Sequence, residues 1–159
     1  MLAAAAEQLA QSPGVTVTHS SPVYETPAAE AAAGQRDFLN AVLRIETTLP
    51  PDALLSRAHE IEHGLGRRRT IPGGPRPVDI DLLLYGSLVR RASDPILPHP
   101  RMHHRLFVLR PLHDIDPAVR HPVTNQSIDN LLAGLPSAGH LKRVMDAGWH
   151  LVNHATSPG

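Results

Sequence analysis

The chain has 159 residues, and its 15 lysines and arginines balance 15 aspartates and glutamates. That length suffices for the core of one domain, so we predict a single domain over residues 1–159. The neutral charge balance argues against nucleic acid as a partner, and the absence of cysteine excludes disulfides and thiolate metal sites. No apolar run approaches the ~18 residues that cross a membrane, and the Ala-rich start lacks the basic region of a signal peptide. We therefore expect a cytoplasmic protein without membrane contact.

Apolar periodicity predicts one helix and three strands in the first part of the chain. The expected elements, in order, are a helix over 2–11, strands over 15–18 and 23–25, a loop over 26–36 and a strand over 38–46. The last strand alternates apolar and polar side chains, with Leu39, Leu43 and Ile45 on one face and Asn40 and Arg44 on the other. This pattern is typical of a half-buried antiparallel strand.

The rest of the chain predicts one long helix and several shorter elements. They are a helix from 50 to 66, a loop over 67–77, a strand around 78–84 that returns as a hairpin through 88–89, helices over 101–112 and 127–134, and an edge strand over 141–145. In the long helix, Leu54, Ala58, Ile61 and Leu65 form one apolar stripe. Because helices and strands alternate without equal βαβ units, we expect an α+β sandwich with helices over a mainly antiparallel sheet.

Two aspartates one residue apart, Asp79 and Asp81, are the strongest functional signal. They alternate with Val78, Ile80 and Leu82, so on a strand both carboxylates project from one face while the aliphatic side chains pack behind them. Two unpaired carboxylates roughly 6–7 Å apart repel each other, and Mg²⁺ held together with substrate phosphates removes that conflict. Taken alone, the pair fits a solvated edge strand about equally well.

A second candidate site is formed by His59, Glu60 and His63, which match H-E-x-x-H on the predicted long helix. Two histidines four residues apart share a helix face and could bind zinc, with Glu60 as the general base of a metallopeptidase. The longer form of the pattern requires a ligand where Arg69 stands, and no glutamate follows Glu62. The apolar stripe also places both histidines on the outer flank of the helix. Zinc chemistry is therefore the weaker alternative.

Several cations and one aromatic residue accompany these motifs. A Gly-Gly-Pro-Arg turn brings Arg76 to the rim of the aspartates, and Arg67 opens a run of three arginines, whose planar guanidinium groups suit phosphate oxygens. His99 lies between two prolines, and the resulting restricted backbone suits a fixed donor. Phe38 shares a strand face with Asn40, and a ring beside an amide could read a flat heterocycle. Helix-end charge, a surface turn and an ordinary core ring explain the same residues structurally.

Taken together, these pieces resemble the 6-hydroxymethyl-7,8-dihydropterin pyrophosphokinase family of the folate pathway. The segments that carry the resemblance are Ser21-Pro22-Val23-Tyr24-Glu25-Thr26-Pro27, Asp37-Phe38-Leu39-Asn40-Ala41-Val42, Gly74-Pro75-Arg76-Pro77-Val78-Asp79-Ile80-Asp81 and Pro98-His99-Pro100-Arg101-Met102. They fall in the family's order and spacing from about residue 15 to residue 117. The Gly-Pro-Arg-x-x-Asp-x-Asp block followed by Pro-His-Pro-Arg-Met is highly specific.

The resemblance implies a ferredoxin-like α+β fold and transfer of pyrophosphate from ATP to the pterin hydroxymethyl group, with release of AMP. It also implies two magnesium ions, held by Asp79 and Asp81, and a monomer is expected. Glu62 matches a recurrent glutamate that we assign to nucleotide binding. The residues expected to be catalytic, of which the arginines and the histidine also bind the nucleotide, are Arg67, Arg76, Asp79, Asp81, His99 and Arg105.

For the pterin, the resemblance implies a different set of residues. Phe38 and Phe107 match the rings that sandwich the pterin, and Asn40 matches the residue that reads its polar edge. Backbone groups near Thr26 and Pro27 are expected to assist. The implied pterin site therefore combines positions before and after the aspartate pair.

The chain also departs from the family pattern. The family begins with a strand that is central to the sheet, whereas this sequence starts within the first helix. Pro72-Gly73 stand where the second loop usually carries Arg-Trp, and residues 118–159 carry little family signal. A relative that binds ATP or pterin without turnover is therefore a further alternative.

Overall fold

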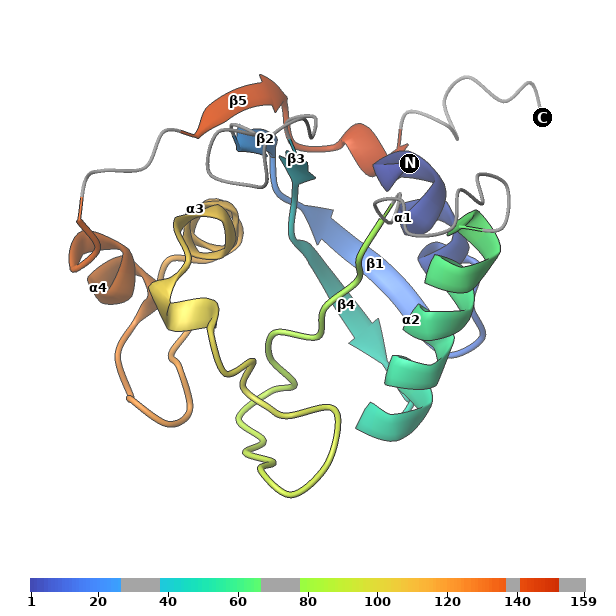
Figure 1. Ribbon diagram of the computed structural model, residues 1–159, viewed down its shortest axis with the longest axis horizontal. Coiled ribbons are helices and arrows are strands. Elements are labelled where there is room, and N and C mark those ends of the chain that lie inside the picture. The colour runs from blue at the N-terminus through green and yellow to red at the C-terminus, as the bar shows by residue number, and fades with distance from the viewer. Residues whose placement is uncertain (27–37, 67–77, 137–140, 152–159) are drawn as a thin grey trace.

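The computed structural model describes residues 1–26, 38–66, 78–136 and 141–151, with backbone alone at Phe38 and Leu151. Its elements, shown in Figure 1, are α1 (Leu2–Ala10), β1 (Val15–Ser20), β2 (Val23–Thr26), β3 (Phe38–Asn40), β4 (Leu43–Thr47), α2 (Pro51–Gly66), the 3-10 turn η3 (Met102–His104), α3 (Leu106–Ile115), α4 (Ile128–Ala133), β5 (Lys142–Met145) and the 3-10 turn η4 (Trp149–Leu151). Within these described ranges, no helix is both long enough and apolar enough to cross a bilayer.

The described strands pair in antiparallel ladders. β1 pairs with β4, so that Val17 lies opposite Ile45, and β2 pairs with β3 on one edge and with β5 on the other. At the bend between the two sheets, the Ser21 N–H donates to the Val42 carbonyl at 2.8 Å. Helices packed on antiparallel sheets confirm the α+β class and are consistent with the implied ferredoxin-like sandwich.

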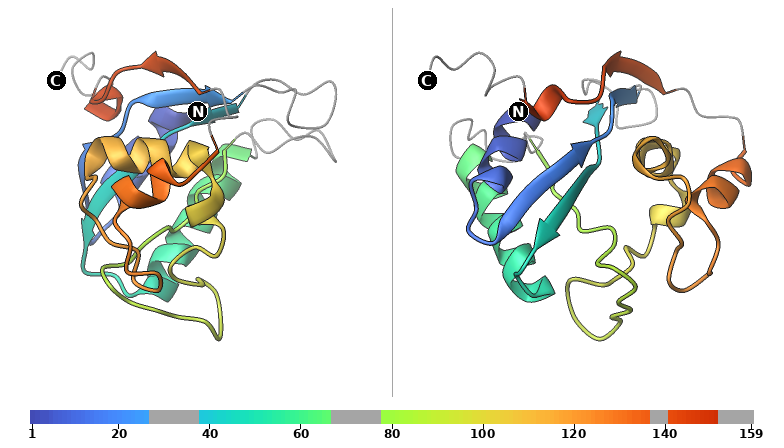
Figure 2. Two further views of the ribbon diagram at one scale, coloured as in Figure 1. Left: turned by 90° about the vertical axis from the view of Figure 1, so that its left-hand side faces the viewer. Right: turned by 180° about the vertical axis from the view of Figure 1, so that it is seen from behind.

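The helices form two groups on opposite sides of β1 and β4. α1 and α2 lie together on one side, and α3 and α4 lie on the other (Figure 1). The view from behind in Figure 2 shows the same separation. Buried side chains follow this division, because one apolar cluster contains Leu109 and Ile128 and another contains Leu9 and Ile61. The two helix groups therefore have separate apolar cores, and residues 78–84 contact both of them.

The long helix α2 confirms its predicted apolar stripe. Pro51 opens the helix, where its fixed φ suits the first turn, and Asp52 adds an acid near the positive end of the helix dipole. Its buried residues are Leu54, Ala58, Ile61 and Leu65. Ile61 is 0% exposed, and full burial of such a side chain contributes roughly 1.5–3 kcal/mol. This face anchors α2 against α1.

The segment over residues 78–84 is extended, but it is not the predicted strand. It has no ladder partner in the ranges that the structure describes. A cleft of about 650 Å³, lined by β4 and by residues 78–86, runs along it. A ladder requires a neighbouring strand about 4.8 Å away, and none of the described strands pairs with this segment. The prediction failed because strand pairing depends on a neighbour as well as on the local pattern.

The alternation within this segment was nevertheless predicted correctly. Asp79 and Asp81 are exposed, Val78 is 7% exposed, and Ile80 is half-buried. Val78 and Ile80 pack against the α1–α2 core, whereas Leu84, further along, packs against the α3–α4 core. The segment therefore connects the two cores while it presents both carboxylates to solvent.

Other predicted boundaries shift by a few residues. The strand over 38–46 breaks at Ala41 and Val42 into β3 and β4, and Leu39 is 48% exposed instead of facing the core. The hairpin return through residues 88–89 is wrong, because the bridge in this region joins Arg90 to Leu97. The helix predicted over 101–112 begins only at Leu106, after η3, since extended backbone at the preceding residue interrupts it.

Candidate active site

Asp79 and Asp81 lie on a backbone that side chains hold in place. The Ile80 N–H between them donates to Glu62 Oε2 on α2 at 2.7 Å, a charge-assisted hydrogen bond. Ile80 also packs with Val78 against the core beneath α1 and α2. These contacts fix the segment that carries the two carboxylates although no ladder forms.

His99 lies beside this segment, and its N–H donates to the Leu83 carbonyl at 2.8 Å. Burial is the main cause that lowers the pKa of His99; the charge of Asp81 raises that pKa, and the charges of Arg105 and Arg101 lower it further. Its Nδ1 accepts the Arg101 N–H at 3.2 Å, which assigns the proton of the neutral ring to Nε2. His99 therefore presents an Nε2–H donor close to one carboxylate and two guanidinium groups.

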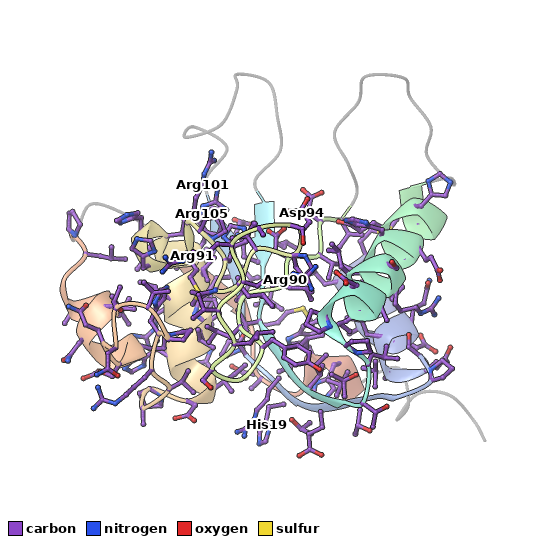
Figure 3. The ribbon with its side chains drawn as sticks, turned by 90° about the horizontal axis from the view of Figure 1, so that it is seen from below. His19, Arg90, Arg91, Asp94, Arg101 and Arg105 are labelled. Carbon is purple, nitrogen blue, oxygen red and sulfur yellow. The ribbon has the colours of Figure 1, made fainter. Side chains whose placement is uncertain are left out.

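Arg105 and Phe107 lie together at the start of α3. Arg105 occupies the N-cap position in extended conformation, and its guanidinium carbon lies 5.3 Å from the centroid of the Phe107 ring, a cation–π contact. Figure 3 shows Arg101 and Arg105 on the same side of the molecule, at the edge opposite His19. A cation suited to phosphate and a planar ring are thus presented by one helix end.

Asn40 and Thr26 are diagonal neighbours across the β2–β3 ladder. Asn40 Nδ2 donates to Thr26 Oγ1 at 2.9 Å, and the ladder places Thr26 opposite Phe38. Because one amide hydrogen is committed to Thr26, the carboxamide of Asn40 has a defined orientation. This orientation suits a residue that must distinguish donors from acceptors on a ligand.

A single cleft gathers these candidates from distant parts of the sequence. The cleft of about 650 Å³ is lined by Asn40, Asp79, Asp81 and Phe107, among other residues. His99 lies close to this group, because the charge of Asp81 raises the pKa of its ring. The structure thus brings two of the predicted pterin residues, Asn40 and Phe107, to the same cleft as the two predicted metal ligands.

The structure gives no side-chain position for four other residues that the sequence predicts in the site. Pro27, Arg67 and Arg76 lie outside the described residues, and the side chain of Phe38 does as well. Their roles stay predictions from the sequence.

The carboxylate pair fits magnesium better than the histidine pair fits zinc. A catalytic zinc site takes three protein ligands, and the described part of the chain holds no group of three such side chains placed to bind a metal. His59 and His63 are exposed on α2, and Glu60 pairs with Arg57 at 3.1 Å. Magnesium needs only one or two carboxylates, because substrate phosphates and water complete its shell. The two exposed aspartates meet that requirement.

Two contacts of the site were missed by reasoning from the sequence. Arg101 is close enough to His99 to lower its pKa, and its place two residues further along was the only available signal. Glu62 was predicted to bind nucleotide, whereas its carboxylate accepts the Ile80 N–H. No sequence pattern pointed to that contact, because the two residues belong to separate elements.

Comparison with known proteins agrees with this arrangement. The model of the 7,8-dihydro-6-hydroxymethylpterin-pyrophosphokinase family matches residues 1–117. The chain is similar to the 2-amino-4-hydroxy-6-hydroxymethyldihydropteridine pyrophosphokinase of Bacillus subtilis, with 41% identity over 121 residues, or 76% of this chain and 72% of that protein.

Longer proteins also match. The folic acid synthesis protein fol1 of Schizosaccharomyces pombe is 40% identical over 126 residues, which is 79% of this chain but 17% of that protein. The mitochondrial folate synthesis bifunctional protein of Arabidopsis thaliana is 44% identical over 102 residues, 64% of this chain and 18% of that protein. The chain spans less than a fifth of these two relatives. Because the family model and the bacterial relative each match most of its length, the chain belongs to the 7,8-dihydro-6-hydroxymethylpterin-pyrophosphokinase family.

Proposed function

We propose that this chain transfers the pyrophosphoryl group of ATP to the hydroxymethyl oxygen of 6-hydroxymethyl-7,8-dihydropterin and releases AMP. The name of the Bacillus subtilis relative, a 2-amino-4-hydroxy-6-hydroxymethyldihydropteridine pyrophosphokinase, supports the reaction. The observation that carries the proposal is the convergence of Asp81 and Arg105 on His99, since the charges of both residues shift the pKa of the His99 ring. A carboxylate, a neutral donor and a guanidinium group together suit a metal-bound polyphosphate.

Asp79 and Asp81 are the residues that would hold magnesium, and we propose two ions that bind together with ATP. When bound, magnesium would neutralise phosphate charge and favour ionisation of the attacking hydroxyl. The two carboxylates supply hard oxygen ligands from one exposed edge of the cleft. Glu62 holds the backbone between them, so its proposed role is to keep both side chains directed to the same side.

In the proposed reaction, the hydroxymethyl oxygen bonds to the β-phosphorus as the bond from that phosphorus to the AMP oxygen breaks. Negative charge therefore develops on the oxygen of the leaving AMP. The Nε2–H of His99 and the guanidinium of Arg105 are described hydrogen-bond donors suited to stabilise that charge. Arg67 and Arg76 are proposed to add further positive charge around the triphosphate.

The pterin is proposed to bind at the end of the cleft formed by β2, β3 and α3. Asn40, held by Thr26, would hydrogen-bond the polar edge of the pterin, and Phe107 would stack on one of its faces. Phe38 is proposed to cover the other face, and backbone near Pro27 to assist. This arrangement would leave the hydroxymethyl group directed toward the phosphate site.

The direct test is nucleotide release by the purified chain with ATP and Mg²⁺, with and without the pterin. We expect AMP, not ADP, and only when the pterin is present. ADP, or AMP that forms at the same rate without pterin, would contradict the proposal. Added EDTA should stop the reaction, and excess Mg²⁺ should restore it.

A second candidate is a member of the family that binds ATP or pterin without turnover. The specific observation that favours it is that residues 78–84 join no ladder with the described strands, so the carboxylate segment lies beside the cleft without that support. A folded sample that binds the pterin by fluorescence titration but releases no AMP would support this candidate over the first.

The proposal also treats the chain as a cytoplasmic monomer. ATP, the proposed co-substrate, is abundant in that compartment. Sedimentation equilibrium tests the oligomeric state, and a dimer at assay concentration would contradict it.

A further inference from the structure

Three side chains join α3 to β2 in what we call the Tyr24 network, which comprises Tyr24, Arg110 and Asp114. The Tyr24 hydroxyl donates to Asp114 Oδ2, and Arg110 Nη2 bonds Asp114 Oδ1 at 3.2 Å. Tyr24 is 5% exposed, so its hydroxyl has little access to water as an alternative partner. A buried donor of this kind favours one docking position of the helix, because any other position leaves it unpaired.

The strand end of this network lies beside the proposed pterin residues. The β2–β3 ladder places Tyr24 directly opposite Asn40, and Thr26 follows two residues later on the same strand. Side chains two residues apart on a strand share a face. Asn40 and Thr26 are themselves joined by a hydrogen bond of 2.9 Å. A shift of β2 relative to α3 would therefore move both polar residues together.

The two α3 residues of the network, Arg110 and Asp114, follow Phe107 along the helix. On an α-helix, positions i, i+3 and i+7 follow one face, and Phe107, Arg110 and Asp114 have that spacing within α3. Asp114 is thus two turns from Phe107 along the same side of the helix. Anchoring Asp114 fixes the angle at which α3 presents the ring to the cleft.

The charge state of the network is well defined. Burial raises the pKa of Tyr24 and Asp114 raises it further, whereas Arg110 lowers it; the net shift is upward, so the hydroxyl keeps its proton and remains a donor. The pKa of Arg110 is raised mainly by its hydrogen bond to Tyr24, so the guanidinium stays charged. Asp114 therefore faces two donors and has no competing like charge within the network.

We propose that Tyr24 and Asp114 are positioning residues that set the gap between Phe107 and the Asn40–Thr26 pair, and hence the affinity for the pterin. The inference rests on the proposed function. Neither residue is assigned a contact with substrate; both act through the elements that they join. The effect is expected on pterin affinity and not on the chemistry at the phosphates.

The test compares Tyr24→Phe with Tyr85→Phe, since these are the two tyrosines of the chain. Tyr85 also loses one hydrogen bond, 2.6 Å to the Leu49 carbonyl, but that bond joins a different pair of elements. For Tyr24→Phe we expect the KM for pterin to rise about 5- to 30-fold, with kcat and the KM for ATP within about twofold of wild type. Tyr85 lines the cleft, but Tyr85→Phe keeps the ring and removes only a hydroxyl that is bonded to the Leu49 carbonyl, so the KM for pterin should stay within about twofold of wild type.

Asp114→Asn supplies a second, independent variant if Tyr24→Phe folds poorly. It keeps the shape and can still accept from Tyr24, so the KM for pterin should rise less, by about threefold. The effects of the two changes should be less than additive in the double variant, because Tyr24→Phe already removes the hydrogen bond that Asp114→Asn weakens. Additive effects of the two changes, or equal pterin KM values for Tyr24→Phe and Tyr85→Phe, would overturn the proposal.

The dissociation constant of pterin, measured by fluorescence on the same variants, separates this inference from the proposed function. If the wild type binds pterin without releasing AMP, the proposed function fails, while a weaker affinity of Tyr24→Phe alone still supports positioning. If the wild type releases AMP and Tyr24→Phe matches it in pterin affinity, positioning alone fails. A wild type that does not bind pterin overturns both.

Discussion

On one side of the cleft, β2, β3 and α3 are joined by a strand ladder and by side-chain hydrogen bonds, and we call this the pterin side. On the other, the carboxylate side (residues 78–84) runs extended, with no ladder to any described strand. The pterin side is cross-linked through Tyr24 and Asn40. The carboxylate side is held by separate contacts, which include the bond from Ile80 to Glu62, the bond from the His99 N–H to the Leu83 carbonyl, and apolar packing.

This difference shows that a motif can specify exposure without specifying how the backbone is held. The alternation of Asp79 and Asp81 with aliphatic neighbours requires only an extended chain with one buried face. A ladder holds a strand through many backbone hydrogen bonds, whereas few hydrogen bonds hold the carboxylate side. Each bond on that side therefore contributes a larger share of what keeps the backbone in place. We therefore expect the two sides to respond differently: substitutions on the carboxylate side should change Mg²⁺-dependent turnover, and substitutions on the pterin side should change pterin affinity.

The largest effect is expected from Asp81→Ala. Removing one of two metal-binding carboxylates should lower kcat by at least about a hundredfold, because charge on the phosphates is no longer neutralised. Steady-state AMP release at saturating Mg²⁺ measures this. Glu46→Ala removes an exposed carboxylate from β4 and should leave kcat unchanged. Wild-type turnover by Asp81→Ala would remove the magnesium assignment.

The next effect concerns Phe107 on the pterin side. Phe107→Ala should raise the KM for pterin about 10- to 100-fold, as expected for a lost ring stack, with a smaller change in kcat. Phe107→Leu keeps apolar volume but loses the flat ring, so it separates stacking from packing. If Phe107→Leu behaved as wild type, the ring would serve only the core.

Glu62 tests how the carboxylate side is held. Glu62→Ala leaves the Ile80 N–H without its acceptor and should raise the Mg²⁺ concentration needed for half-maximal activity about tenfold. Glu62→Gln keeps an oxygen at the same place, so the Mg²⁺ concentration needed for half-maximal activity should rise only about threefold. Equal effects of both variants on the KM for ATP, with no change in Mg²⁺ dependence, would instead support the predicted nucleotide contact.

The smallest effect concerns acid stability and lies away from the cleft. Burial lowers the pKa of His103 and of His121, and the charges of His104 and His103 respectively lower these values further. Below the ordinary value of 6.5 the unfolded chain binds more protons than the folded one, so the free energy of unfolding falls as pH falls. Melting curves between about pH 7.5 and 5.5 measure the slope.

A matched variant is His121→Asn, whose amide oxygen can accept the same two backbone N–H groups, from Val123 and Thr124. It should flatten the decline of Tm with acid while the Tm near neutral pH stays close to wild type. An unchanged slope would show that His121 does not contribute to acid sensitivity.

Much of the fold could be predicted because it depends on local pattern. The stripe through Leu54 and Ile61 located α2, and the 2-residue alternation around Asp79 predicted which side chains are exposed. The motif order identified the family that the comparisons confirm. These features are readable because helix and strand periods repeat within a few residues of the same segment.

Tertiary structure alone decided the remaining features. Whether residues 78–84 join a ladder depends on a neighbour far away in the sequence, and so do the bond from Glu62 to Ile80 and the effect of Asp81 on the pKa of His99. Hydrogen bonds and charges act over a few ångströms in space. The sequence determined which side chains are available to the site, and folding determined which of them meet.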